Sequence, residues 1–370
     1  MLCGGLCVAS AFPALGAADR AKDAPKDPAL RPLVVSTLGA TMQDAMQKAF
    51  FSPFTAQTRI GIHAGSWDGL LATLQNQTRT GVDPSNQSLL LMDNASLLLA
   101  CRQGLLLPID PALIPGLVQD GHSRMDSDAL SPCGLGAFRM NLVLAWDKSR
   151  IDSVPGWPDF WDVARRPGKR GLARDPRGTL EIALLADGVA PRDVYRTLGS
   201  SEGLDRAFRK LDQLKPYIVW WDTPEQAVHI IESGAVLMTS APNDAVAAAD
   251  LVGHRDFGIQ WQQSLSTIVS WTTPGRPPAI GTGASGPPDD RVVHARQLLG
   301  FMLDPARQAD FVTRYPAVSL VQNVQPPDQA LPADSPASAQ HLHDALREDD
   351  AFWATHLDPL KARFDAWIGS

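Results

Sequence analysis

Short apolar runs and amphipathic segments alternate along most of this 370-residue chain. The run from Pro32 to Thr37 predicts a strand, and a helical pattern follows from Met42 to Phe51, with Ser52-Pro53 predicting its end. The same order returns with an apolar run at 88–92 and a helical pattern at 95–103. Because strands that alternate with helices favour mostly parallel sheets covered by helices, the chain is predicted to have an α/β fold.

A second series of strand and helix patterns begins near residue 141 and ends near Trp261. One of its helices is marked by Thr223, a favoured N-cap residue, with Pro224 at the first helical position. Two such series fit the usual size of roughly 100–200 residues per domain. We therefore expect two domains.

Acidic residues outnumber basic ones, with 40 Asp and Glu against 33 Lys and Arg, and no basic block of five or more residues occurs. Nucleic-acid affinity rests mainly on clustered Lys and Arg, so this composition argues against a nucleic-acid partner. The eight His residues are scattered, and the close pair of His341 and His343 lacks a third ligand. No metal site is therefore predicted.

The segment from Gly281 to Gly286 has the spacing GxGxxG, but Pro277-Pro278 precede it and Pro287-Pro288 follow it. A dinucleotide site needs a strand before this motif and a helix beginning inside it, so the segment is predicted to be a surface loop. No GxSxG nucleophile motif occurs either. The sequence thus predicts no cofactor and no enzyme, although a dispersed catalytic set would leave no linear motif.

Residues Met1 to Ala18 carry no charged side chain and end in small residues. They are too short for a membrane span and are typical of a secretory signal, with a disordered tail as the alternative. Residues 19–31 are expected to form a flexible leader. In an exported chain Cys101 and Cys133 could form a disulfide, but the sequence does not fix their separation in space.

In open α/β sheets, small ligands bind beyond the carboxyl ends of the strands. The first series of strands places Ser36, Thr37, Asp93 and Asn94 at such ends. We expect a ligand-binding cleft there.

The second half of the chain contains motifs that resemble a known protein family. They are Trp157-Pro158-Asp159-Phe160-Trp161 with Pro167-Gly168-Lys169-Arg170, the segment from Leu180 to Val189, the segment from Leu211 to Pro216, and Trp220-Trp221. Together they resemble the spermidine/putrescine-type periplasmic solute-binding proteins of ABC importers, over roughly residues 31–320. The motifs mark positions in the fold more firmly than they mark a ligand.

This resemblance implies a two-lobed periplasmic-binding-protein fold in which each lobe is a mostly parallel sheet flanked by helices. The lobes are joined by crossing strands that act as a hinge and close on a solute. The expected division is 32–140 plus 264–325 for the first lobe, and 141–263 plus 326–370 for the second lobe with the C-terminal helices. The resemblance also implies a periplasmic location, delivery to permease subunits in the inner membrane, and a monomer whose lobes are free to move.

The family's ligand contacts transfer to three positions of this sequence. The polar residue at the end of the strand before the helix at 95–103 is Asp93, the acidic residue two before an Arg is Asp175, and the cleft Trp after a Gly-x-Gln strand is Trp261. Other positions depart from the pattern, since Gly178 and Gln263 stand where carboxylates are expected. A polyamine needs several carboxylates, so the sequence supports the family's role better than its ligand.

The hypothesis is a receptor for a small polar, cationic or amine-bearing solute, similar to a polyamine. Trp261 and then Trp221 are predicted to supply aromatic faces, and Asp93 and Asp175 the negative charge. The predicted hydrogen-bonding residues are Thr37, Asn94, Asn243 and Gln263. The alternative is an enzyme or sensor domain with the same two-lobed fold, while a purely structural domain would have no solute-sized cleft.

Overall fold

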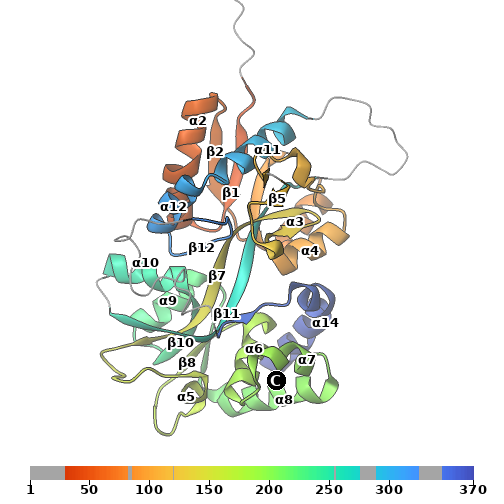
Figure 1. Cartoon of the computed structure of the whole chain (residues 1–370). Coiled ribbons are helices and arrows are strands. Elements are labelled where there is room, and N and C mark those ends of the chain that lie inside the picture. The colour runs from red at the N-terminus through yellow and green to blue at the C-terminus, as the bar shows by residue number, and fades with distance from the viewer. Residues whose placement is uncertain (1–29, 82–85, 120, 254–255, 276–288, 325–343) are drawn as a thin grey trace, which may run out of the picture.

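The computed structural model describes residues 30–81, 86–119, 121–253, 256–275, 289–324 and 344–370. Two groups of helices and strands, lobe 1 and lobe 2, lie at opposite ends of two long strands that pass through both (Figure 1). The long strands are β7 (Gly134–Asp147) and β11 (Phe257–Thr272). They form the connection that the sequence predicts as a hinge.

Lobe 1 is the upper group in Figure 1. Its elements are β1 (Leu33–Thr37), α1 (Ala40–Met46), the π-helical turn η1 (Gln47–Phe51), α2 (Ser52–Thr58), β2 (Ile62–Ser66), α3 (Leu71–Arg79), β3 (Leu89–Asp93), α4 (Asn94–Arg102), α11 (Asp290–Met302), α12 (Pro305–Arg314) and β12 (Val318–Ser319). The short strands β4 (Val118–Gln119), β5 (His122–Ser123) and β6 (Leu130–Ser131) precede β7.

Lobe 2 is the lower group. Its elements are α5 (Trp157–Trp161), β8 (Arg170–Ala173), α6 (Pro176–Ala186), α7 (Val194–Leu198), α8 (Ser201–Leu214), β9 (Ile218–Trp221), α9 (Pro224–Glu232), β10 (Met238–Pro242) and α10 (Asn243–Gly253). The chain ends with β13 (Leu346–Arg347), which pairs with β11, and with α14 (Asp350–Gly369), which packs against α6 of lobe 2 and α4 of lobe 1.

The strands form one mixed sheet in the order β2-β1-β3-β11-β7-β10-β8-β9. Pairing is parallel within each lobe, from β2 through β1 to β3 and from β10 through β8 to β9. It is antiparallel where β3, β11, β7 and β10 meet. The predicted two-lobed α/β fold is confirmed, and the carboxyl ends of the parallel strands in both lobes point to the region between them.

Each lobe has its own buried core. In lobe 1 the core is rich in Phe, including Phe50 and Phe311, whose rings lie 5.3 Å apart. In lobe 2 it contains Trp157 and Trp353, which are 2% and 0% exposed. The Trp residues of this chain are therefore mostly scaffold, because large aromatic rings bury much apolar surface at each position.

The predicted end of the first helix at Ser52-Pro53 is wrong. The helix continues from η1 directly into α2, and Pro53 lies in the first turn of α2. Proline is tolerated there because the π-helical turn before it, in which the Ser52 N–H donates to the Gln47 carbonyl, relaxes the regular bonding pattern. The predicted cap at Thr223 is confirmed, since its hydroxyl oxygen accepts a hydrogen bond from the Gln226 N–H at 3.3 Å.

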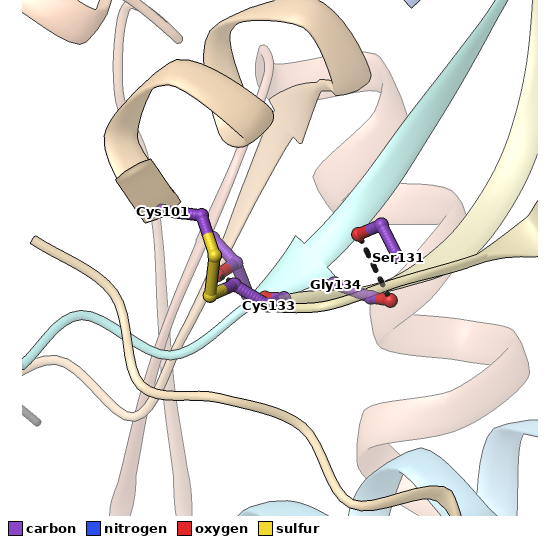
Figure 2. Close-up of a disulfide and its surroundings, with 5 residues drawn as sticks. Cys101, Ser131, Cys133 and Gly134 are labelled. Carbon is purple, nitrogen blue, oxygen red and sulfur yellow. Dashed lines mark hydrogen bonds between the residues drawn. A yellow bond between two sulfur atoms is a disulfide. The ribbon is translucent and has the colours of Figure 1, made fainter. Parts of the chain in front are cut away.

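Cys101 and Cys133 form a disulfide, with their Cα atoms 5.9 Å apart. Figure 2 shows that it joins the end of α4 to the residues just before β7, where the Ser131 hydroxyl donates to the Gly134 carbonyl at 3.3 Å. It settles the pairing that the sequence left open. Since α4 begins beside the region between the lobes, the disulfide also anchors the far end of a helix that positions the site.

Among the residues that the structure describes, no helix is long and apolar enough to cross a bilayer. The predicted signal segment, the predicted leader up to residue 29, the Gly281–Gly286 loop and the pair His341 and His343 lie outside those residues.

Candidate functional site

A cavity of about 500 Å³ lies between the lobes, against the middle of β7 and β11. Its polar and charged lining comes from the strand ends of both lobes, the two long strands and the C-terminal segment, and comprises Asp93, Asn141, Arg174, Asp175, Arg177, Asp222, Thr267, Glu348 and Lys361. The apolar lining includes Leu70, Met140, Leu142, Trp221 and Leu265. A concave site with a mostly apolar wall and a few convergent polar groups is the usual form of a small-molecule site.

The local backbone at the start of α6 positions Arg177. Asp175 caps the helix by accepting from the Arg177 N–H at 2.8 Å, and the chain bends sharply at Gly178, whose φ is 77°. A Cβ atom on Gly178 would lie 2.7 Å from a methyl carbon of Leu142. Glycine is therefore required here both for its backbone conformation and for the close approach to β7.

The Arg177 guanidinium connects the two lobes. It donates through Nη2 to Asp175 at 3.0 Å within lobe 2, and through Nη1 to Asp93 at 2.9 Å and Ser96 at 3.2 Å in lobe 1. Burial disfavours its charge, but the carboxylates of Asp175 and Asp93 outweigh that effect and raise the pKa of Arg177 well above its ordinary value. Arg177 is therefore a fixed positive charge in the wall.

Glu348 brings a third carboxylate to the same place from the opposite end of the chain. It follows β13 and lies beside Asp93, Arg177 and Thr267. Burial and the nearby Asp93 carboxylate raise its pKa to about 8, although Arg177 and the Thr267 hydroxyl act in the opposite direction. At neutral pH, Glu348 therefore holds a proton for most of the time.

Three buried polar atoms of residues in the wall lack hydrogen-bond partners among the described residues. They are the Thr267 hydroxyl, the indole nitrogen of Trp221, which is a donor, and the side-chain oxygen of Asn141, which is an acceptor. Trp221 and Asn141 are almost fully buried, at 7% and 1% exposed. An unsatisfied buried polar group costs about 1–3 kcal/mol, so both positions favour a bound molecule that supplies an acceptor and a donor.

The lobes also touch on the other side of the long strands. Tyr315 at the end of α12 donates a hydrogen bond to Asp244 of α10, and the Asn243 side chain donates to the Pro316 carbonyl at 2.7 Å. A second cavity of about 320 Å³ lies there, with Gly39 and Glu225 on its lining. In this conformation the lobes therefore contact each other on both sides of the connection.

A family model described as bacterial extracellular solute-binding protein matches residues 49–339. The match spans more than half of the chain. The chain belongs to this family. The gamma-aminobutyric acid-binding protein of Pseudomonas aeruginosa is 32% identical to it in an alignment of 344 residues that covers 90% of each protein.

Two solved structures show the same fold. The periplasmic binding protein MotA from Agrobacterium tumefaciens B6, in complex with glucopine, has a TM-score of 0.76 and 22% identity and covers 91% of this chain and 99% of its own. The spermidine/putrescine substrate-binding protein PotD from Streptococcus pneumoniae has a TM-score of 0.67 and 14% identity, with the same coverage. The predicted family is thus confirmed. At 22% and 14% identity, the two solved structures support the fold alone.

Three of the predicted ligand-binding residues of this solute-binding protein line the cavity. They are Asp93, Asp175 and Trp221. Asp93 and Asp175 also cap α4 and α6 and bind Arg177, so their carboxylates are already engaged in the absence of a solute.

The other five predicted residues lie outside that cavity lining. The Thr37 hydroxyl donates to the Gly65 carbonyl at 3.3 Å, and Asn94 accepts from the Ser270 hydroxyl at 2.5 Å. Asn243 accepts from the Asn141 N–H at 2.9 Å, which fixes β10 against β7.

Trp261 and Gln263 lie in a bulge of β11. The register with β7 passes from Gln260 directly to Leu265, so the residues between them leave the ladder. Gln263 has a φ of 57°, and its carbonyl accepts from the Trp157 indole at 3.0 Å. Leu265 and Thr267, which follow the bulge, are the β11 residues that reach the cavity.

The cations of this solute-binding protein's cavity, together with Asn141 and Glu348, were not among the predicted site residues. In the sequence, Arg177 was used only to locate Asp175. Its position two residues after a predicted cleft carboxylate could have indicated that Arg177 itself lies in the cleft. Glu348 and Lys361 had no such signal, because a chain separation of about 170 residues or more from Arg177 conceals their proximity. In the part of the chain that the structure describes, no group of His, Cys, Asp and Glu is arranged to hold a metal ion.

Proposed function

We propose that this protein is the periplasmic receptor of an ABC importer and binds a short amino acid whose ammonium and carboxylate groups lie at opposite ends. One observation carries the proposal: the cavity wall presents an unpartnered donor and an unpartnered acceptor among charges of both signs. The relative at 32% identity is named for gamma-aminobutyric acid, a molecule of this type. The receptor is expected to act as a monomer that hands the solute to permease subunits, and its lobes must open and close.

The carboxylate end is assigned to the lobe 2 side of the cavity. There the Trp221 indole N–H offers a hydrogen bond, and the adjacent strand end carries Arg174, whose backbone N–H donates to the Trp221 carbonyl at 2.9 Å. The Arg174 side chain is half-exposed and lies 3.5 Å from Asp222, a loose pair that a carboxylate can displace. Hydrogen bonds between charged groups are stronger than neutral ones, so an oxygen of the solute satisfies both donors.

The ammonium end is assigned to the side nearest β7, β11 and β13. Asn141 supplies an unpartnered carbonyl oxygen there, and Glu348 supplies a carboxylate. Between the two ends, Leu142 and Leu265 offer apolar surface to the methylene groups of the solute. A chain of a few methylenes would separate the two charges.

The charge distribution supports a zwitterion over a polyamine. The lining carries three cations and four carboxylates, but Asp93 and Asp175 both pair with Arg177, and Asp222 lies beside Arg174. Within the described residues, Glu348 is the lining carboxylate for which no ion pair within 4.0 Å is seen. A multiply charged cation would meet too little uncompensated negative charge to replace its hydration.

Isothermal titration of the purified protein against a solute panel tests this proposal. We expect binding of 4-aminobutyrate or 5-aminopentanoate, and much weaker binding of putrescine, spermidine and succinate, which each lack one of the two charge signs. Tighter binding of putrescine than of every amino acid would contradict the zwitterion. Turnover of a panel member, followed by NMR, would instead favour the enzyme alternative.

A Trp221→Phe variant is expected to bind the amino acid about tenfold or more weakly, because a hydrogen bond to a charged group contributes about 1.5–3 kcal/mol. Its free energy of unfolding should change by no more than about 1 kcal/mol, since the substitution also removes an unsatisfied buried donor. Titration calorimetry and urea unfolding measure the two effects.

The neighbouring Trp220 provides the matched control. Its ring packs against Phe364 and Trp367 at 5.7 and 6.1 Å, away from the cavity lining. Trp220→Phe should therefore lower stability without changing affinity. Equal losses of affinity in both variants would remove Trp221 from the site.

A further inference from the structure

Glu348 lies in the wall between two hollows of the protein. One is the interlobe cavity, and the other is an open groove of about 770 Å³ on the outside, between η5 (Pro191–Asp193), α7 and the segment 344–350. Glu348 belongs to the lining of both. Its carboxyl group can therefore face a bound solute and still exchange protons with water when the lobes are closed.

The surroundings of Glu348 leave its charge uncompensated. Arg177 is the nearby guanidinium. Its Nε and Nη2 atoms donate to Asp175, and its Nη1 atom donates to Asp93 and Ser96. Three carboxylates thus share one cation that already binds two of them. Two like charges that are close together favour protonation of one of them, and Glu348 is the carboxylate without a bond to Arg177.

We propose, on the basis of the proposed function, that Glu348 receives the ammonium group of the solute and that binding releases one proton from Glu348 to solvent. Before binding, the carboxyl group is neutral, with the proton on one carboxyl oxygen. The arriving ammonium keeps its own three protons and pairs with the carboxylate that forms when Glu348 loses its proton. That proton leaves through the outer groove, so the net charge of the Glu348 site with the ammonium group bound is the same as before binding.

Titration behaviour supports this exchange. Burial and the Asp93 carboxylate raise the pKa of Glu348 to about 8, so the group is mainly protonated at pH 7. An aliphatic amine has a pKa near 10 and stays charged in this range, so the solute itself does not titrate. The charged or titratable groups around Glu348 on the packed elements are Asp93, Arg177, Tyr195, Asp350 and Lys361. Asp175 lies on the cavity side, and Arg192, Asp344, Arg347 and Asp349 line the groove.

None of those groups replaces Glu348 as the proton source. The pKa of Arg177 and of Tyr195 is raised, so both keep their protons at pH 7. The pKa of Asp350 is raised to about 6, mainly by burial, so this group is mostly ionised at pH 7. Asp350 also belongs to the groove lining alone.

The test is titration calorimetry of the full protein with 4-aminobutyrate at pH 7, in phosphate and in Tris, whose ionisation enthalpies differ. The buffer dependence of the binding heat gives the number of protons released, and we expect a value close to one. Between pH 6 and pH 7.5, the dissociation constant should fall about tenfold per pH unit and then level off above pH 8.

Glu348→Gln should bind the solute more weakly, release no proton, and show no pH dependence over this range. Asp350→Asn is the matched control, and it should still release most of one proton, because Asp350 is the smallest of the causes that raise the pKa of Glu348. Solute binding with no proton released would overturn the inference and leave the proposed function intact, as would unchanged release in Glu348→Gln. If 4-aminobutyrate and the rest of the amino-acid panel do not bind, the proposed function itself fails.

Discussion

An Arg177→Met variant is expected to lose about a hundredfold or more of its preference for 4-aminobutyrate over putrescine. The substitution frees the carboxylates of Asp93 and Asp175, which Arg177 holds at 2.9 and 3.0 Å. Truncating one partner of such a charge pair costs about 2–5 kcal/mol, largely because the remaining charge stays partly buried. A carboxylate in the solute would be repelled by the two freed charges, whereas a diamine would be attracted.

The competing result is informative because Arg177 could instead serve only to hold the lobes together. In that case the affinities for both solutes would fall equally, and their ratio would stay constant. Titration calorimetry with each solute measures the ratio, and urea unfolding checks that the variant remains folded. Arg177→Lys is the control: it keeps the charge but not the planar set of donors, so the ratio should fall much less.

The parts of this protein that could be predicted from its sequence are those set by local pattern. The alternation of strands and helices and the cap at Thr223 follow from periodicity and residue type over short windows. The continuous helix through Pro53 was missed because the stop signal is also local, and a π-helical turn accommodates it here.

The site was less predictable because it depends on register and on distant segments. Trp261 fits the family pattern along the sequence, but the bulge after Gln260 moves the cavity positions to Leu265 and Thr267. A shift of a few residues in a strand redirects its side chains, and no local pattern marks the bulge. Glu348 reaches the cavity only because β13 pairs with β11.

Charge pairing explains why Asp93 and Asp175 line the cavity without offering it free carboxylates. Both stand where helix caps and cleft carboxylates are expected, and both line the cavity. The sequence could not show that one arginine would bind both. That pairing leaves fewer free carboxylates in the cavity than the sequence predicts, and this is why we propose a zwitterion as the solute.

A Trp353→Ala variant is expected to have a free energy of unfolding about 3–5 kcal/mol lower than that of the natural protein. The Trp353 side chain is 0% exposed in the core of lobe 2, and its indole N–H donates to the Glu181 carboxylate at 2.7 Å. The cavity left by a buried Trp that is replaced by Ala lowers the free energy of unfolding by about 3–5 kcal/mol. The substitution also removes the hydrogen-bond donor of the buried Glu181. Urea unfolding at pH 7 measures the loss. A loss below about 1 kcal/mol would mean that α14 contributes little to lobe 2.

The pH dependence of stability distinguishes the loss of the Trp353 indole N–H from the loss of its ring. Burial raises the pKa of Glu181 from 4.5 to about 7, so the native state retains a proton that the unfolded chain loses between these values. Its stabilising contribution is therefore complete below pH 4.5 and falls as the pH rises to 7. Trp353→Phe removes a donor from the ionised form, so its loss of stability should be larger at pH 8 than at pH 5.

Trp157→Phe provides the comparison for that pH effect. Trp157 is also almost fully buried, but its indole donates to the uncharged Gln263 carbonyl at 3.0 Å. Its loss of stability should therefore be the same at pH 5 and pH 8, because no titrating group receives the hydrogen bond. If the two variants show the same pH dependence, the Trp353 donor does not stabilise ionised Glu181, and the attachment of α14 rests on apolar packing alone.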